Sequence, residues 1–225
     1  MIFQRFLQTL SAVIITLLVT LSSGLTDVVR TDLSQIEMRA DHDAVSAGSD
    51  FYVVIELTPD LGWHAYWENP GDAGLKLTMD WELPTGVNIG DLQFTTPHLI
   101  PFEEIVSYGY DGKVTIIAEA SIDENVDVEA VTIGGSAFWL VCSDALCVPQ
   151  EADIGFSLSV GEKKVNQKVS AIVEAAKSDM PIPVDWKSSF YTDGENFHVK
   201  SIIPEQYPVI ESAYVFPHSE GMMEN

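Results

Sequence analysis

The feature that most constrains the fold of this chain is an alternation of apolar and polar residues, broken by Pro and Gly at short intervals. The alternation is complete over residues 76–83, where Leu77, Met79, Trp81 and Leu83 share one face of an extended strand. Further strand-like runs lie at residues 36–40, 51–57, 113–120, 131–140 and 154–160. About seven short strands with turn residues between them predict an all-β fold, an antiparallel β-sandwich. The runs do not alternate with helices, which argues against a thioredoxin-like or dinucleotide-binding fold.

One later stretch has the period of a helix. Over residues 163–177 the apolar side chains recur every three or four positions, and the pattern ends before Met180-Pro181-Ile182-Pro183. The apolar positions are Val165, Val169, Ile172, Val173 and Ala176. We predict a linker helix within residues 162–183, following a first domain over residues 30–161.

Residues 184–225 return to strand-like patterns. Three runs, at residues 186–191, 197–203 and 209–216, are too few to close a second sandwich. A small appended sheet would account for them. We favour the other interpretation, an incomplete second β domain in a chain that is the front part of a longer protein.

The N-terminal residues 1–24 resemble an export signal. Arg5 precedes a mostly apolar stretch over residues 10–21, and Ser22, Ser23 and Gly24 offer a cleavage site. The apolar stretch is short for a membrane helix, which needs roughly 20 residues. We therefore predict a protein that is exported and soluble outside the cytoplasm, with an uncleaved membrane anchor as the competing interpretation.

The net charge excludes several function classes. Eleven Lys and Arg residues oppose 34 Asp and Glu residues, which gives a formal charge of −23. Such a surface repels nucleic-acid phosphates and anionic lipid headgroups. Two cysteines are too few for a disulfide-dense scaffold or a four-thiolate zinc site, and no hydrolase elbow, phosphate loop or zinc-protease helix is present.

The first candidate for chemistry is the pair Cys142 and Cys147 in FWLVCSDALCVPQ. Four residues separate the cysteines, and Ser143-Asp144-Ala145 can turn the chain so that the two sulfurs meet. A ring this small stabilises a fold by only about 2 kcal/mol in the loop-entropy model, whereas a small, local disulfide is easily reduced and exchanged. The spacing differs from C-x-x-C and leaves both a static bond and a redox-active bond open.

The second candidate is the aromatic segment GWHAYWENPGDAGL, residues 62–75. Its Trp63, His64, Tyr66 and Trp67 suit the core of a sandwich, and this structural role is the one we favour. We expect Asn69-Pro70-Gly71-Asp72 to make a turn. A copper or zinc site formed by His64, His98 and a cysteine is the alternative.

The third candidate is EEIVSYGYDGKV, residues 103–114. Tyr108 and Tyr110 flank Gly109, and Asp111-Gly112 has the composition of a hairpin turn. An aromatic loop of this kind could shield a nearby disulfide from solvent. From the residues alone, an ordinary hairpin with tyrosines at its base is favoured.

In this order, the three segments resemble the periplasmic N-terminal domain of the DsbD/ScsB family of thiol:disulfide interchange proteins. The family pattern is G-W-H-x-Y-W-x-N-P-G-D-x-G, then Y-G-Y-x-G, then W-L-V-C, a short gap and C-x-P. Here these motifs occupy residues 62–74, 108–112 and 139–149. The later AYVFPHSEGMMEN, residues 213–225, looks like the opening of the second extracytoplasmic segment of longer members.

The resemblance implies an immunoglobulin-like β-sandwich in which Cys142 and Cys147 cycle between dithiol and disulfide, with Tyr108, Gly109 and Tyr110 in a cap loop. It implies electrons that arrive from a membrane electron-transfer domain and a thioredoxin-like donor domain. The electrons would pass to periplasmic partner proteins that bear disulfides, with no cofactor. The chain would then be a protein-disulfide reductase component of periplasmic electron transfer and cytochrome c biogenesis.

The expected mechanism is thiol–disulfide exchange: one thiolate attacks a partner disulfide and the second cysteine resolves the mixed disulfide. We favour Cys147 as the attacking residue, although no pattern assigns it. The charge of Asp144 disfavours a thiolate, so we expect a pair that stays unreactive until a partner displaces its cap. A non-catalytic binding module with a permanent Cys142–Cys147 disulfide remains a second hypothesis, and a metal-handling domain a third.

Overall fold

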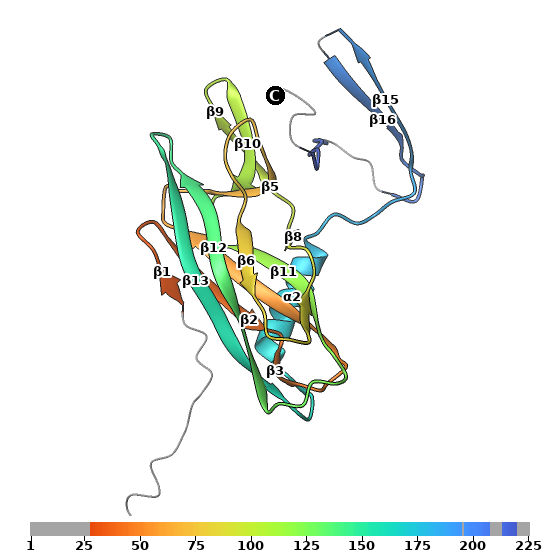
Figure 1. The fold of residues 1–225 in the computed structure, drawn as a ribbon. Coiled ribbons are helices and arrows are strands. Elements are labelled where there is room, and N and C mark those ends of the chain that lie inside the picture. Colours follow the sequence, from red (N-terminus) through yellow and green to blue (C-terminus); the bar gives the residue numbers. More distant parts are fainter. Residues whose placement is uncertain (1–27, 195, 208–212, 220–225) are drawn as a thin grey trace, which may run out of the picture.

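The computed structural model describes residues 28–194, 196–207 and 213–219. Figure 1 shows two sheets stacked face to face, as the alternating pattern predicts, with a smaller sheet at one end and one helix against the outside. The predicted export signal, residues 1–24, lies outside the described residues. Among the described residues, no helix is long and apolar enough to cross a membrane.

The first sheet has the strand order β1-β2-β4-β11-β7, with β8 also paired to β11. Its strands are β1 (Val29–Arg30), β2 (Ser34–Ala40), β4 (Asp50–Pro59), β7 (Val87–Ile89), β8 (Gln93–Phe94) and β11 (Val114–Ile122). All of its pairings are antiparallel.

The second sheet has the order β14-β3-β13-β12-β6. Its strands are β3 (His42–Val45), β6 (Thr78–Glu82), β12 (Ala130–Cys142), β13 (Cys147–Val160) and β14 (Lys164–Val165). Its pairings are antiparallel except for a short parallel contact between β13 and β3. Leu77, Met79, Trp81 and Leu83 face the core as predicted.

The third sheet, in the order β5-β10-β9, covers one end of the sandwich. Its strands are β5 (Ala65–Gly71), β9 (His98–Phe102) and β10 (Ile105–Tyr110). The predicted Asn69–Asp72 turn is wrong in its position, because β5 continues through Gly71. The predicted hairpin at Asp111-Gly112 is also wrong, because these residues lead from β10 in the third sheet to β11 in the first and the two strands do not pair.

The inner faces of the sheets form one hydrophobic core. Trp139 on β12 is nearly fully buried, and its indole N–H donates to Ser34 Oγ at 3.2 Å, which joins the two main sheets. The third sheet contributes Trp67 and Tyr108 to the same core. The core therefore extends from the centre of the sandwich to the third sheet.

The helix α2 (Gln167–Ser178) packs on the outer face of the first sheet. Val169, Val173 and Ala176 contact Val54 and Ile117, which point away from the sandwich core. The helix starts later than the predicted residue 163, because Lys164 and Val165 form strand β14. The predicted linker helix is thus present, but it covers the sandwich.

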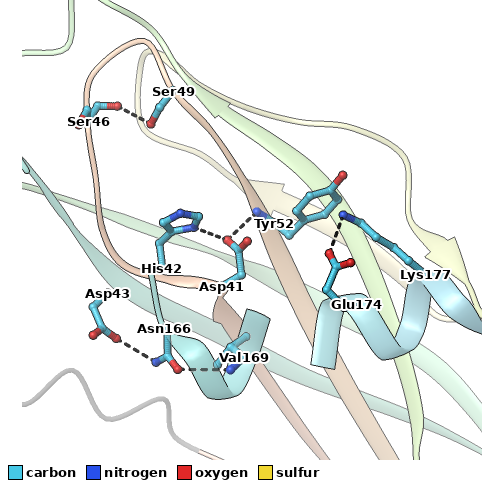
Figure 2. Close-up of polar contacts among 10 residues, drawn as sticks. All are labelled: Asp41, His42, Asp43, Ser46, Ser49, Tyr52, Asn166, Val169, Glu174 and Lys177. Atoms are coloured by element: carbon cyan, nitrogen blue, oxygen red, sulfur yellow. Dashed lines mark hydrogen bonds and ion pairs between the residues drawn. The ribbon is translucent and has the colours of Figure 1, made fainter. Parts of the chain in front are cut away.

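Polar contacts fix both ends of α2, as Figure 2 shows. Asn166 caps the N-terminus: its Oδ1 accepts from Val169 N at 3.3 Å, and its Nδ2 donates to Asp43 Oδ1 at 2.9 Å. In the last turn, Lys177 Nζ lies 3.9 Å from the centre of the Tyr52 ring on β4. These contacts tie the helix to the first domain at both ends.

Beyond α2, strands β15 (Lys187–Asp193) and β16 (Asn196–Ile202) form a separate two-stranded sheet. They match two of the three predicted strand runs. The third run, residues 209–216, lies partly outside the described residues, and its described part, residues 213–216, is not in a strand.

Candidate redox site

Cys142 and Cys147 form a disulfide at the tip of the β12–β13 hairpin. Their Cα atoms are 4.0 Å apart and face each other as the last pair of the ladder. Ser143 N donates to Leu146 O at 3.0 Å, and Ala145 N donates to Ser143 Oγ at 3.3 Å. The predicted tight loop is confirmed, and these two hydrogen bonds within it help to bring the two sulfurs together.

The two cysteines differ in burial. Cys142 is 2% exposed and ends the apolar strand β12, whereas Cys147 is exposed at the start of β13. An incoming thiolate can therefore reach Cys147 far more easily than Cys142. The asymmetry gives the pair one accessible and one protected member.

The aromatic segment meets the disulfide through a backbone bridge. His64 N donates to Cys142 O at 2.9 Å, and Cys142 N donates to His64 O at 3.0 Å. This exchange of two hydrogen bonds is the pairing of neighbouring antiparallel residues. It places the residues after His64, which form β5, next to the cysteine hairpin.

Tyr66 is the side chain that reaches the disulfide sulfur. Its hydroxyl lies 3.9 Å from Cys147 Sγ and 3.1 Å from His64 Nε2. A disulfide sulfur carries no hydrogen, so the hydroxyl is the donor in the contact with Cys147. Burial raises the pKa of Tyr66 to about 12, which keeps the hydroxyl protonated at neutral pH.

His64 lies in a partly desolvated position between acidic residues. Burial lowers the pKa of His64, and the charges of Asp111 and Asp144 oppose that shift without cancelling it. Asp111 follows β10 and Asp144 lies between the cysteines, so the segment 103–114 also approaches the site. All three sequence motifs converge on this end of the sandwich.

The sequence model of the family described as "Thiol:disulfide interchange protein DsbD, N-terminal" matches residues 34–157, more than half of the chain. The chain belongs to this family. Its DsbD N-terminal domain carries the Cys142–Cys147 disulfide. A search of curated proteins found no match.

Solved structures agree with the fold. The chain is similar to the N-terminal periplasmic domain of ScsB from Proteus mirabilis, with a TM-score of 0.61 and 18% sequence identity over 78% of this chain and 68% of that one. The DsbD N-terminal domain thus has the immunoglobulin-like β-sandwich that the resemblance implied. The GAE domain of GGA2p from Saccharomyces cerevisiae overlaps far less, with a TM-score of 0.34, 10% identity, and 57% of this chain against 93% of that one.

The expected cap loop is a strand in this DsbD N-terminal domain. Tyr108, Gly109 and Tyr110 lie in β10. Both tyrosines are buried, so they do not form an exposed loop. Tyr110 donates its hydroxyl hydrogen to Thr95 O at 2.7 Å. The loop assignment is wrong because β10 pairs with β9 on one side and β5 on the other. A shielding role for these residues stays a prediction.

Gly109 has a packing role that explains the Y-G-Y motif. It pairs with Tyr66, and a Cβ atom at this position would lie 2.1 Å from Ala65 O. Gly74 is a second such position, where a Cβ would meet the Tyr66 ring at 2.3 Å. Gly74 is the last residue of the G-W-H-x-Y-W-x-N-P-G-D-x-G motif, and nothing in the sequence alone indicates its contact with Tyr66.

The remaining motif residues shape β5 around the site. Trp67 is fully buried, and Trp63 packs on the rim of the core. Asn69 Oδ1 accepts from Gly71 N at 3.1 Å, and Gly71 has a φ of +81°, which glycine adopts readily. Pro70 between them has no N–H to offer a neighbouring strand, and the pairing of β5 with β10 is irregular here.

The histidines of the suggested copper site are held by aromatic neighbours. His64 meets the Tyr66 ring edge-on, and His98 on β9 does the same with Tyr110. Within the described ranges, no group of three His, Cys, Asp or Glu side chains is placed to hold a metal ion.

Proposed function

We propose that this DsbD N-terminal domain relays reducing equivalents in the periplasm by opening and re-forming the Cys142–Cys147 disulfide. The observation that carries the proposal is the pairing of an exposed Cys147, contacted by the Tyr66 hydroxyl, with a buried Cys142. A purely static disulfide has no need of an exposed cysteine beside a hydrogen-bond donor.

In the loading step, a donor thiolate attacks Cys147 Sγ. The Cys142–Cys147 bond breaks, a donor–Cys147 disulfide forms, and Cys142 leaves as a thiolate. The donor's second thiolate then attacks its own sulfur in the mixed disulfide and releases Cys147 as a thiolate. Two electrons have moved, the donor is left as a disulfide, and both cysteines of the domain are reduced.

In the delivery step, the Cys147 thiolate attacks a partner disulfide and expels one partner thiolate. Cys142 then attacks Cys147 Sγ in the mixed disulfide, which restores the Cys142–Cys147 bond and releases the second partner thiolate. The burial of Cys142 fits a resolving role, because this residue reacts only with a sulfur already bound next to it. In this scheme Cys147 forms each mixed disulfide with another protein.

Tyr66 assists both steps through one hydrogen bond. Its protonated hydroxyl can donate to the negative charge on Cys147, which forms when the donor's second thiolate releases this sulfur and is present when Cys147 attacks a partner disulfide. Asp144 acts in the opposite direction, since its charge lies close to both sulfurs in sequence. The Tyr66 hydroxyl therefore supplies stabilisation that no Lys or Arg within residues 138–150 can provide.

The proposed donor is a thioredoxin-like domain supplied through a membrane electron-transfer domain, and the proposed acceptors are periplasmic proteins with disulfides. Membership of the DsbD N-terminal family supports these classes of partner, and the related ScsB domain is described as periplasmic. The periplasmic location of the related ScsB domain also supports the proposal that residues 1–24 direct the export of this chain.

Trapping of the mixed disulfide tests the proposal. The Cys142→Ser variant keeps Cys147 but loses the resolving thiol, so it should form a lasting mixed disulfide with a thioredoxin-like domain activated by a thiol reagent. The matched Cys147→Ser variant keeps only the buried cysteine and should form at least tenfold less adduct in non-reducing gels. Equal yields, or no adduct with either variant, would contradict the proposed relay.

A further inference from the structure

A segment near the C-terminus lies against the third sheet. We call residues 213–219 the C-terminal strap; Figure 1 draws them in dark blue. Tyr214 and Phe216 alternate along the strap, and both rings meet Tyr108 on β10, with centres 6.2 and 5.2 Å away. Phe216 also meets Trp67 on β5 edge-on at 6.0 Å.

His218 continues the alternation. Its ring lies 5.5 Å from that of Trp67, and its Nδ1 lies 2.6 Å from Glu68 Oε1. Three side chains spaced two residues apart therefore face the same surface, which is the pattern of an extended segment laid along a sheet.

The backbone of the strap is held as well. Asn69 Nδ2 donates to Pro217 O at 2.6 Å and to Ser219 O at 3.3 Å, while its Oδ1 accepts from Gly71 N. The Asn69 side chain is buried and uses both ends of its amide. One side chain thus fixes the bend of β5 and the position of a segment about 150 residues away.

The strap and the β15–β16 hairpin that precedes it differ in how far their aromatic contacts are buried. Trp67 and Tyr108, beneath the strap, are 2% and 0% exposed, and Phe216 packs against the main core. Phe190 on β15 is 76% exposed and meets only the Phe197 ring among the described aromatic contacts. Phe216 therefore anchors the strap to the core of the sandwich, although Tyr214 stays 46% exposed, whereas no described residue of the preceding hairpin packs against that core.

We infer that the β5–β10 surface around Trp67, Asn69 and Tyr108 is a binding surface for an extended segment with aromatic side chains at alternate positions, and that the C-terminal strap is its occupant. The domain then reaches beyond the predicted boundary at residue 161 to include residues 213–219. Because Trp67 adjoins Tyr66 on β5, the strap also holds the strand that contacts Cys147.

This inference does not depend on the redox cycle. It explains why a W-E-N run follows Tyr66, since each of Trp67, Glu68 and Asn69 has a partner in the strap. Exchange at Cys147 could fail with the strap in place, and the strap could be absent with exchange intact.

The test uses the full chain with the disulfide intact and hydrogen exchange read by mass spectrometry. Phe216→Ala should raise the exchange of β5 and β10 amides, residues 65–71 and 105–110, at least fivefold, with that of β4 and β11 unchanged. Phe190→Ala, which removes an equal ring from the exposed hairpin, should leave all four strands as in the parent.

A milder variant distinguishes a local effect of the strap from misfolding of the whole domain. Phe216→Leu keeps the apolar volume but loses the ring, and it should give a smaller rise in exchange confined to the same two strands. If both Phe216 variants exchange like the Phe190→Ala control, the strap does not occupy the surface and the inference is overturned.

Discussion

The hydroxyl of Tyr66 lies 3.9 Å from Cys147 Sγ, although 81 residues separate the two in the chain. Two features create this relationship: the His64–Cys142 backbone bridge, which aligns the segments, and Gly109, which lets β10 approach the backbone of β5. The contact links the aromatic motif directly to the chemistry of the cysteines.

Removal of the Tyr66 hydroxyl should slow exchange. Tyr66→Phe keeps the ring but deletes the donor, so the charge on Cys147 loses a hydrogen bond. We expect the reaction of the reduced domain with a model disulfide at pH 7 to slow about three- to tenfold, which corresponds to roughly 0.7–1.4 kcal/mol. Stopped-flow kinetics of the reduced protein provide the measurement.

Tyr110→Phe is the matched control for that experiment. It deletes a buried hydroxyl that donates to Thr95 O, so it should cost stability while leaving the exchange rate near that of the parent. The interpretation of Tyr66 as a donor to Cys147 fails if both variants slow exchange equally.

His64 should make the stability of the domain depend on pH. Burial lowers the pKa of His64 from its ordinary value of 6.5, so below that pH the unfolded chain binds a proton that the folded chain resists. The free energy of unfolding should therefore fall as pH drops from 7 through 6.5, until the folded pKa is passed. His64→Gln should lose less stability than the parent over this window in urea titrations. Parallel curves for the two proteins would contradict the assignment.

Gly109 should be intolerant of a side chain. Gly109→Ala puts a Cβ against Ala65 O, which forces β5 and β10 apart and should lower the free energy of unfolding by about 2 kcal/mol. Gly112→Ala is the control, because nothing lies within 4 Å of its Cβ position, and it should change stability by less than about 1 kcal/mol. Urea unfolding with the disulfide intact compares them, and similar losses for both would refute the close-packing role.

Much of the sandwich could be predicted from the sequence, because its strands have one face in the core. Residues 76–83 show this best, since burial of Leu77 and half-burial of Met79 and Trp81 follow the alternation. The disulfide was also predictable, because the four residues between the two cysteines include turn-forming side chains and allow the chain to bring the sulfurs together.

The third sheet could not be predicted by the same means. The run through Pro70 and Gly71 has the composition of a turn, yet β5 passes through it. Within this run the Asn69 side chain accepts from Gly71 N and donates to Pro217 O of the strap, a segment distant in sequence. Tyr108 and Tyr110 resemble loop residues beside glycine, and only the pairing with β9 and β5 shows them to be buried. Contacts between distant segments decided both cases.

The reduction potential of the Cys142–Cys147 pair tests the central claim most directly. Equilibration of the purified domain with dithiothreitol buffers of known potential, followed by alkylation and mass spectrometry, gives the fraction of dithiol at each potential. A relay requires a potential above about −300 mV, so that a thioredoxin-like donor can reduce the bond. A value well below about −300 mV would make the disulfide a permanent structural bond and contradict the account.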